Sequence, residues 1–351
     1  TYEQRIYQRV IPYAKMIGIE KLSDIKKDSF SNYSTYYRKV GVKGKWKSEA
    51  KGLAVSTINS DLTTVNELLS WCVQQDLLEF KNWGDMGKLR DKKDYREDAN
   101  PAYMPDEWEQ VKNVLKENEN SEPDPIKKWK NCYLKNWVYF QYHGGFRCHE
   151  TRAIKLNDIE VVRKNGKVKW GVVQVSPSTK TGKRTVIMNG NWLNAVKYHL
   201  NKGIKLRNEE IELHNKMVKD GTLPRWRANQ EPIELIPFPP PPDTLLMSNP
   251  FLKGMPPMSD ERIRQWLNKL LSELDFYKLK DYTLHSLRST HITHALIVRD
   301  MNIREIADNV GNSQSEIERT YYRLNNMLNM EKLGFFREQI SKKNELQVTG
   351  D

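Results

Sequence analysis

Several residues with reactive or charged side chains lie in short, separated stretches of this chain. Two adjacent tyrosines, Tyr321 and Tyr322, end the polar run GNSQSEIERTYYRL. A tyrosine oxygen can act as a nucleophile, or both rings can simply pack against the protein. Arg147 follows two glycines, and His285 and Arg288 are one helical turn apart in HSLR. Guanidinium forks bind phosphate oxygens, but each of these patterns alone is more often structural than catalytic.

The composition indicates a globular protein whose positive charge suits a polyanionic partner. The chain has 351 residues, of which 38% are hydrophobic and 29% charged, and this length suffices for two domains with ordinary cores. No apolar run approaches the length that spans a bilayer, so no membrane partner is predicted. A net charge of +12 suits nucleic acid, because counterion release from phosphates drives association. The same charge balance also occurs in proteins that bind no nucleic acid.

The cysteines and the N-terminus bear on the compartment. Three widely spaced cysteines fit a reducing compartment better than a disulfide framework, so we expect a cytoplasmic, nucleoid-associated protein in a prokaryotic or host cell. The start, TYEQRIYQRV, is neither a signal peptide nor an initiator, and we expect the sequence to begin inside a longer chain. Four residues could form a metal site on paper but match no zinc spacing, so no metal is predicted: Cys132, His143, Cys148 and His149.

The first hundred residues are predicted to be helical. The segment VSTINSDLTTVNELLSWCVQQDLL has apolar residues at helical spacing, with Ser56 or Thr57 placed to cap the start. This apolar stripe should face a core, and its members are Ile58, Leu62, Val65, Leu69, Cys72 and Val73.

A basic stretch, YYRKVGVKGKWKSEAK, precedes this helix. Its glycines and lack of periodicity favour a loop. The loop is either a solvated basic surface or a phosphate-contacting one, and both interpretations stay open. The candidate DNA-binding residues are Arg38, Lys39, Lys43, Lys45, Lys47 and Lys51.

A charged stretch without apolar periodicity, GKLRDKKDYREDANP, predicts a domain boundary. We expect a helical domain at 1–98, a linker at 99–105 and a second domain at 106–329. The second domain should begin with two amphipathic helices, in MPDEWEQVKNVLKEN and IKKWKNCYLKNWVYFQYH. Residues 330–351 are predicted to form a terminal amphipathic helix and tail.

After Arg147 the hydrophobic period changes to two. Strand-forming residues lie on both sides of Asn165 and Gly166, which together are the strongest short hairpin signal. The stretch KTGKRTVIM predicts a third strand. The proline-rich segment ELIPFPPPPDTLLMSNPFLKGMPP forbids regular structure and indicates an extended connection.

Three of these stretches together resemble the tyrosine recombinases, or phage-type integrases. GGFRCHETRAIKLNDIE is similar to the family's arginine and acid pattern, with Arg147 followed by Glu150. STKTGKRTVIM resembles the β-hairpin lysine motif and places the lysine at Lys180. The stretch that begins TLHSLRSTH resembles the closing block, with His285 and Arg288 as the His-x-x-Arg pair. The order and separations of all three agree with the family.

The resemblance implies that a tyrosine attacks a DNA phosphorus and forms a 3′-phosphotyrosine, without metal, ATP or another cofactor. Arg147 and Arg288 would clamp the non-bridging oxygens, where negative charge develops in the transition state. Lys180 would protonate the departing 5′ oxygen. His285 would hydrogen-bond the phosphate or assist the tyrosine proton, and Glu150 would orient Arg147.

The chain departs from the family pattern at Asn312, where a histidine or tryptophan is usual. Asparagine can still donate a hydrogen bond to a phosphate oxygen, but it lacks the charge of an imidazolium and is shorter. The family's nucleophile lies nine residues later, which predicts Tyr321 and leaves Tyr322, about 100° around the helix, to pack. A one-residue shift in this loop would exchange the two tyrosines.

The predicted fold is mainly α with a small antiparallel β-sheet. Resemblance implies an N-terminal helical DNA-binding domain and a catalytic domain that close as a C-shaped clamp around double-stranded DNA. It also implies a homotetramer on paired recombination sites, strand exchange through a Holliday junction, and accessory DNA-bending factors as a further partner class. The terminal segment 330–351 is the candidate for exchange between protomers.

Two other functional classes remain open at this point. A type IB topoisomerase would use nearly the same residues to relax supercoils without a dedicated site. A catalytically silent DNA-binding regulator could keep the fold but would tolerate loss of Tyr321, Arg147 or Arg288.

Overall fold

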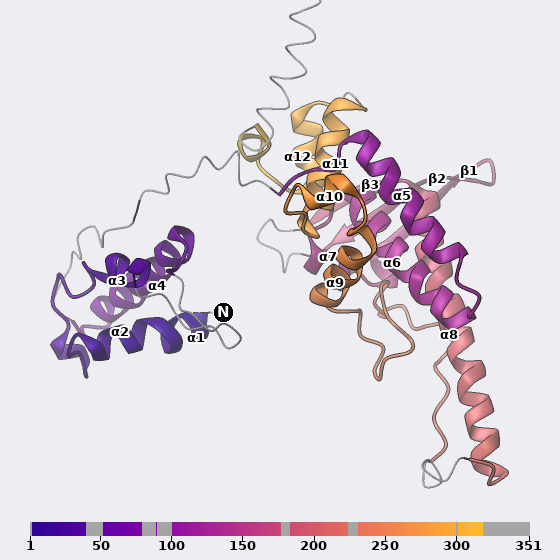
Figure 1. Ribbon diagram of the computed structural model, residues 1–351, viewed down its shortest axis with the longest axis horizontal. Helices are drawn as coiled ribbons and strands as arrows, with labels where there is room; N and C mark the ends of the chain where they lie inside the picture. The colour runs from indigo at the N-terminus through magenta and orange to yellow at the C-terminus, as the bar shows by residue number, and fades with distance from the viewer. Residues whose placement is uncertain are drawn as a thin grey trace, which may run out of the picture. The chain divides into compact units, whose positions relative to one another are not determined.

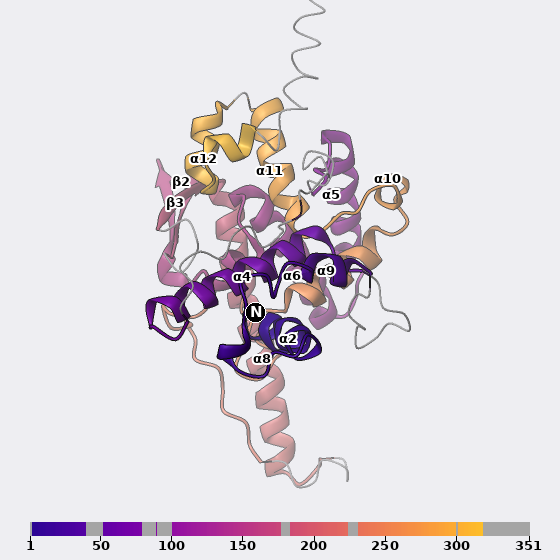
Figure 2. The same ribbon diagram turned by 90° about the vertical axis from the view of Figure 1, so that its left-hand side faces the viewer.

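The computed structural model describes residues 2–39, 52–78, 89, 100–176, 183–223, 231–299 and 301–318. The chain divides into two compact units, residues 1–97 and 98–351, and each is described by itself (Figures 1 and 2). Helices dominate both units, and the described strands form one small antiparallel sheet. The predicted fold class is therefore confirmed.

The first unit is a small helical bundle. Its core combines the predicted apolar stripe with a group of tyrosines, among which the Tyr13 and Tyr33 rings lie 4.9 Å apart. The stripe prediction is confirmed, since Ile58 and Leu62 are fully buried. The elements are α1 Tyr2–Arg5, the π-helical turn Ile6–Val10, α2 Ile11–Met16, the 3-10 turn Leu22–Asp24, α3 Tyr33–Lys39 and α4 Val55–Gln74.

The predicted cap of α4 is wrong. The helix begins at Val55, and the residue before it, Ala54, has an extended backbone with ψ of 145° and makes no side-chain cap. Ser56 and Thr57 therefore lie inside the first helical turn. The extended backbone that defines a helix start already occurs at Ala54, so neither hydroxyl residue occupies the capping position.

A buried ion pair closes the core of the first unit. The Arg9 guanidinium donates from Nε to Asp61 Oδ2 at 2.6 Å and from Nη2 to Asp61 Oδ1 at 2.7 Å. The Tyr33 hydroxyl donates to Asp61 Oδ2 at 3.1 Å. The Asp61 side chain is completely buried, so three donors replace the water it has lost.

The second unit packs helices around the sheet and a central helix, α6. Trp137 and Phe140 of α6 are fully buried, and α5, α8 and α11 pack against this helix. The elements are α5 Pro105–Asn120, α6 Pro125–Gly144, α7 Cys148–Ala153, the 3-10 turn Leu156–Asp158, β1 Ile159–Lys164, β2 Lys167–Val175, β3 Arg184–Met188, α8 Gly190–Lys219, α9 Asp260–Leu271, α10 Asp275–Lys278, α11 His285–Ile297 and α12 Ile303–Val310.

The predicted hairpin and third strand are both present. The sheet has the order β1-β2-β3, with antiparallel neighbours. Asn165 and Gly166 have φ of 53° and 74°, the left-handed pair that a tight two-residue hairpin turn requires. On β3, Val186 and Met188 face the core and alternate with exposed residues.

The proline-rich connection contains no helix, as predicted, but only its first part is extended and held along α8, whereas turns follow between residues 242 and 254. Asn208 donates to the Ile236 carbonyl and accepts from its amide, both at 2.8 Å, and Asn215 does the same with Ile233. Two helical turns separate the asparagines, which is about 10.5 Å, and three extended residues cover about the same distance. None of the helices in the described part of the chain is long and apolar enough to cross a membrane.

Candidate active site

The end of α6 determines where Arg147 lies. Gly145 ends the helix in the left-handed conformation, with φ of 60°. A Cβ at this position would lie 2.7 Å from His291 Cδ2 and 2.9 Å from Val310 Cγ1. Both the backbone and the available space therefore require glycine. After this turn the chain places Arg147 at the N-cap position of α7.

Glu150 holds Arg147 through its backbone and its side chain. Glu150 Oε2 accepts from the Arg147 amide at 2.8 Å, and Oε1 accepts from Arg147 Nη1 at 3.0 Å. The Glu150 side chain is completely buried. Burial alone would raise the pKa of this carboxyl, but hydrogen bonds from Arg184 and Arg147 lower it to about 2. Glu150 is therefore a carboxylate at neutral pH.

Arg288 reaches the same place from α11. The residue is 1% exposed, and its guanidinium donates from Nη1 to the Gly145 carbonyl and from Nη2 to the Val310 carbonyl at 2.6 Å. These contacts join the ends of α6 and α12. A buried guanidinium needs such partners, since its charge is costly to remove from water.

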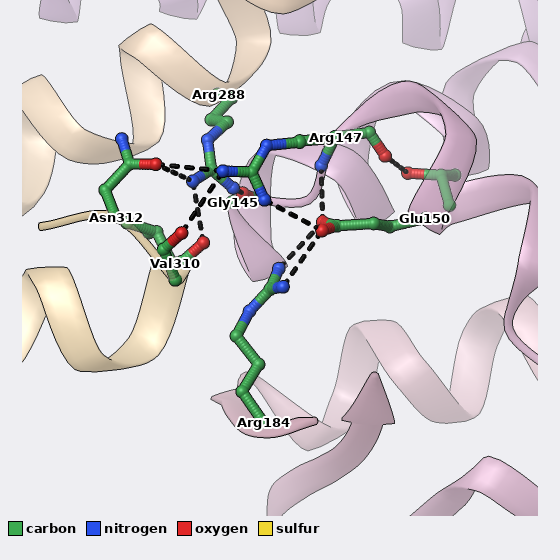
Figure 3. Close-up of polar contacts among 9 residues, drawn as sticks. Gly145, Arg147, Glu150, Arg184, Arg288, Val310 and Asn312 are labelled. Atoms are coloured by element: carbon green, nitrogen blue, oxygen red, sulfur yellow. Dashed lines mark hydrogen bonds and ion pairs between the residues drawn. The ribbon is translucent and has the colours of Figure 1, made fainter. Parts of the chain in front are cut away.

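Asn312 lies between the two arginines. Its Oδ1 accepts from Arg147 Nη2 and from Arg288 Nη2, each at 3.0 Å (Figure 3). The amide nitrogen points away from the two guanidiniums. The amide oxygen faces the guanidiniums because it can accept their hydrogen bonds, whereas the amide nitrogen, like the guanidinium nitrogens, is only a donor. In this structure Asn312 thus acts as an acceptor, whereas the sequence had suggested a donor.

The C-terminus of α12 supplies the remaining acceptors. Gly311 ends this helix with φ of 68°, and its carbonyl accepts from Arg147 Nη2 at 3.1 Å. The preceding carbonyl, that of Val310, accepts from Arg288. The last carbonyls of a helix lack intrahelical partners and form the negative end of its dipole. Two like-charged guanidiniums can therefore approach each other here.

His285 begins α11, and part of its surface is open to solvent. Loss of water on its packed side lowers its pKa to about 4, and the positive charges of Arg288 and Arg147 add to the effect. The imidazole is therefore neutral at pH 7. It can give or accept one hydrogen bond there, but it contributes no formal charge.

Arg184 is a site residue that the sequence reasoning missed. It is the first residue of β3, and its guanidinium donates to both oxygens of Glu150, at 2.9 and 2.7 Å (Figure 3). Its side chain is 7% exposed. The alternation of a strand was the available signal, because Arg184 lies on the same face as the buried Val186 and Met188.

The structure brings together five of the residues predicted for the site: Arg147, Glu150, His285, Arg288 and Asn312. Lys180, Tyr321 and Tyr322 lie outside the described residues, as does segment 330–351. Of the predicted DNA-binding residues, Arg38 and Lys39 form the exposed last turn of α3. The other four lie outside the described residues and are Lys43, Lys45, Lys47 and Lys51.

The described side chains at this site are suited to bind a phosphate diester. Arg147 and Arg184 contact one carboxylate, Glu150, and Arg288 shares the Asn312 oxygen with Arg147, so these described groups carry more positive than negative charge. Two of the guanidiniums converge on a single oxygen, which is the geometry that a non-bridging phosphate oxygen requires. Among the described residues, no three acidic, histidine or cysteine side chains form a group that could hold a metal ion.

Residues 107–327 match the sequence model of the phage integrase family, which is more than half of the chain. The chain belongs to this family. Solved structures that resemble this family member include a site-specific recombinase and two integrases, each bound to DNA. No curated protein sequence matches the chain significantly.

Three solved structures show how widely the fold is shared. XerH site-specific recombinase bound to palindromic difH substrate, in a post-cleavage complex, has a TM-score of 0.59 at 13% identity, covering 96% of this chain and 79% of that one. The Tn1549 transposon integrase in complex with transposon right-end DNA has a TM-score of 0.50 at 15% identity, covering 95% and 98%. A lambda integrase dimer bound to a COC′ core site has a TM-score of 0.50 at 12% identity, covering 91% and 70%.

Proposed function

We propose that this phage integrase family member is a site-specific DNA recombinase that cuts and rejoins duplex DNA through a 3′-phosphotyrosine intermediate. The observation that carries the proposal is the convergence of Arg147 and Arg288 on one oxygen, at 3.0 Å from each. Family membership supports site-specific recombination as the reaction class. The protein would need no metal ion and no ATP, because the phosphotyrosine bond conserves the energy of the broken phosphodiester.

The two guanidiniums would act on the phosphate at the cleavage point. A non-bridging oxygen would take the place that Asn312 Oδ1 occupies in this structure, and the asparagine would turn its amide nitrogen toward the phosphate. Negative charge grows on these oxygens in the transition state, and prearranged donors stabilise it without further reorganisation. Glu150 would keep Arg147 in position, and neutral His285 would hydrogen-bond the phosphate or the nucleophile.

Tyr321 and Lys180 complete the proposed reaction. The Tyr321 oxygen would form a bond to phosphorus as the bond to the 5′ oxygen breaks, and Lys180 would give that oxygen its proton. Attack of a 5′ hydroxyl on the phosphotyrosine would reverse these transfers and release the tyrosine. Tyr322 would pack against the protein.

Two basic surfaces are proposed to contact DNA phosphates. In the catalytic unit, a cavity of about 540 Å³ between the start of α6, the connection after Asn249 and α9 has one acidic residue and four basic ones in its lining. The basic residues are Lys127, Lys130, Arg262 and Lys269. In the first unit, Arg38 and Lys39 are exposed. Cations so placed release counterions when they neutralise phosphates, so affinity should fall steeply with salt.

The proposed assembly follows the family. Residues 1–98 would bind DNA, residues 106–329 would hold the active site, and residues 330–351 would be exchanged between protomers. Two protomers would occupy each recombination site and four would form the synaptic complex, with strands exchanged in pairs through a Holliday junction. Accessory DNA-bending factors and a cytoplasmic location fit the same proposal.

Deletion of 330–351 should weaken tetramer assembly more than binding to one site, and equal loss of both would contradict the exchange.

Covalent capture tests the reaction. The intact protein, Tyr321→Phe and Tyr322→Phe are incubated with fragmented DNA from the source cell, resolved on a denaturing gel, and the trapped DNA is sequenced. Adducts lost only with Tyr321→Phe are expected, and their sequence would reveal the recombination site. Loss only with Tyr322→Phe would keep the reaction and change the nucleophile.

Two further outcomes separate this function from its alternatives. Tight DNA binding without any adduct from the intact protein would indicate a silent regulator. Relaxation of a supercoiled plasmid that lacks the captured site, with no strand exchange between two such sites, would indicate a topoisomerase.

A further inference from the structure

We infer that Arg184 is a positioning residue for the phosphate clamp, acting on Arg147 through Glu150. The inference rests on the proposed function, because it concerns how the same site binds its phosphate. It adds a residue that the family motifs in this sequence did not single out.

The hydrogen bonds of Glu150 form a closed set. Each carboxylate oxygen accepts one bond from Arg147 and one from Arg184. Oε1 accepts from Arg147 Nη1 at 3.0 Å and from Arg184 Nη1 at 2.9 Å. Oε2 accepts from the Arg147 amide at 2.8 Å and from Arg184 Nη2 at 2.7 Å. Arg184 makes the two-pronged contact, which determines both the plane and the direction of the carboxylate. Arg147 uses only one guanidinium nitrogen for Glu150 and keeps Nη2 on Asn312.

Loss of Arg184 would change how Arg147 distributes its guanidinium nitrogens between Glu150 and Asn312. Glu150 is completely buried, so a carboxylate without Arg184 would seek replacement donors. Arg147 can supply one, because its Nη1 already donates to Glu150 Oε1 at 3.0 Å and Nη2 belongs to the same guanidinium. A two-pronged pair between Glu150 and Arg147 would draw Nη2 away from Asn312, which is where the phosphate oxygen is proposed to bind.

A second contact leads from Arg184 to the same guanidinium. A Cβ added to Gly311 would lie 2.8 Å from Arg184 Cδ, so the arginine stem packs directly against this glycine. The Gly311 carbonyl in turn accepts from Arg147 Nη2. The strand is also joined to α12 by the Ile187 amide, which donates to Asn309 Oδ1 at 3.0 Å. Arg184 therefore supports Arg147 both through Glu150 and through the end of α12.

The test measures the rate of covalent adduct formation in a single turnover, on a DNA site captured as above. Arg184→Met is compared with Arg163→Met, which removes the same charge from an exposed position on the same sheet. Three substrates carry an ordinary phosphate, a methylphosphonate or a 5′-bridging phosphorothiolate at the cleavage point. A methylphosphonate lacks one negative oxygen and so needs less of the arginine clamp. A sulfur leaving group needs no general acid, because a thiol has a pKa of about 8.5.

On the ordinary phosphate, Arg184→Met should slow adduct formation roughly 10- to 100-fold, the range known for residues that orient metal ligands through a hydrogen bond. Arg163→Met should change nothing. The defect of Arg184→Met should shrink on the methylphosphonate, as that of Arg147→Ala should, and should persist on the phosphorothiolate. A defect that shrinks only on the phosphorothiolate would place Arg184 with the general acid and overturn the inference. An equal defect on all three substrates would show a merely structural role and would overturn it as well.

A double-mutant cycle guards against simple misfolding. Glu150→Gln removes the buried charge that Arg184 neutralises, so the pair Glu150→Gln with Arg184→Met leaves no unpaired carboxylate. If Arg184 acts through Glu150, adding Arg184→Met to Glu150→Gln should cost less than threefold. Multiplicative losses would show that the two residues act independently, against the inference. Adducts from the intact protein that disappear with Tyr321→Phe establish the function separately, so its failure cannot be confused with a failure here.

Discussion

Each unit of this protein buries a carboxylate against arginine, and the two sites differ in how their charges balance. In the first unit Asp61 faces one guanidinium, that of Arg9, in a two-pronged pair. In the second unit Glu150 contacts two guanidiniums, those of Arg147 and Arg184, and Arg147 also shares the Asn312 oxygen with Arg288. Both acids are completely buried.

In the balanced pair, Arg9 and Asp61, one positive charge meets one negative charge. In the unbalanced cluster, the described guanidiniums outnumber the single carboxylate of Glu150, which favours binding of an anion. Asp61 and Arg9 neutralise each other, and the tyrosine hydroxyl that joins them is neutral. Among the described residues of the second site, one carboxylate accompanies three guanidiniums, and peptide and amide oxygens accept further hydrogen bonds from Arg147 and Arg288. Neutral acceptors compensate a guanidinium only in part. Burial of an ion pair alone thus does not distinguish the two sites, which differ, among the described residues, in the number of guanidiniums around the carboxylate.

The largest expected effect is on the balanced pair. Arg9→Met leaves Asp61 buried without its cation, which should cost about 3–5 kcal/mol of stability in the first unit. Hydrogen exchange of the α4 amides measures this loss locally. Arg9→Met combined with Asp61→Leu should recover most of it, since no charge then remains buried. A double variant as unstable as Arg9→Met would mean that the pair does more than balance charge.

Removal of one arginine from the unbalanced cluster should leave stability nearly unchanged and reduce the rate of adduct formation. Arg147→Met leaves Glu150 paired with Arg184, so the thermal unfolding temperature should change little. Adduct formation should fall about 10²- to 10³-fold, the usual cost of one lost donor to the transition-state charge. Single-turnover cleavage and calorimetry measure the two quantities. Unfolding of the catalytic unit by this change would remove the distinction between the two sites.

Substitutions at Asn312 change the charge between Arg147 and Arg288 directly, because its side chain contacts both guanidiniums. Asn312→Asp places an anion between Arg147 and Arg288 and should compete with the phosphate, slowing cleavage roughly 10- to 100-fold, because hydrogen bonds to charged groups contribute about 1.5–3 kcal/mol. Asn312→His should keep or raise cleavage. Adduct formation at two DNA concentrations shows whether the Asp variant is limited by binding. Complete loss with His would place this position outside the phosphate contacts.

The smallest expected effect concerns His285. Its pKa in the folded protein, about 4, lies below its ordinary value of 6.5. The unfolded chain therefore binds the proton more readily, so this contribution to stability is present above pH 6.5 and is lost as the pH falls toward 4. Urea unfolding at pH 7.5 and pH 5 should show a smaller difference in His285→Gln than in the intact protein. An equal difference would mean that His285 is not desolvated in the folded state.

The sequence predicted the elements better than it predicted the contacts at the site. The stripe from Ile58 to Cys72 and the turn at Asn165 and Gly166 were predictable because helix faces and tight turns depend on neighbouring residues. The cap at Ser56 or Thr57 was wrong, because the true start at Ala54 has no side-chain signal. Arg184 was missed because its partner is 34 residues away, and strand alternation indicates only that its side chain lies on the buried face.

By itself, the sequence determined the mainly helical fold, the small antiparallel sheet and the family, through motifs whose order and spacing are visible along the chain. Only the tertiary structure decided that Arg147, Arg184 and Arg288 converge from α7, β3 and α11 around one carboxylate and one amide oxygen. The physical reason is that secondary structure follows from short-range preferences. The balance of charge at a site, in contrast, depends on groups that become neighbours only when the chain has folded.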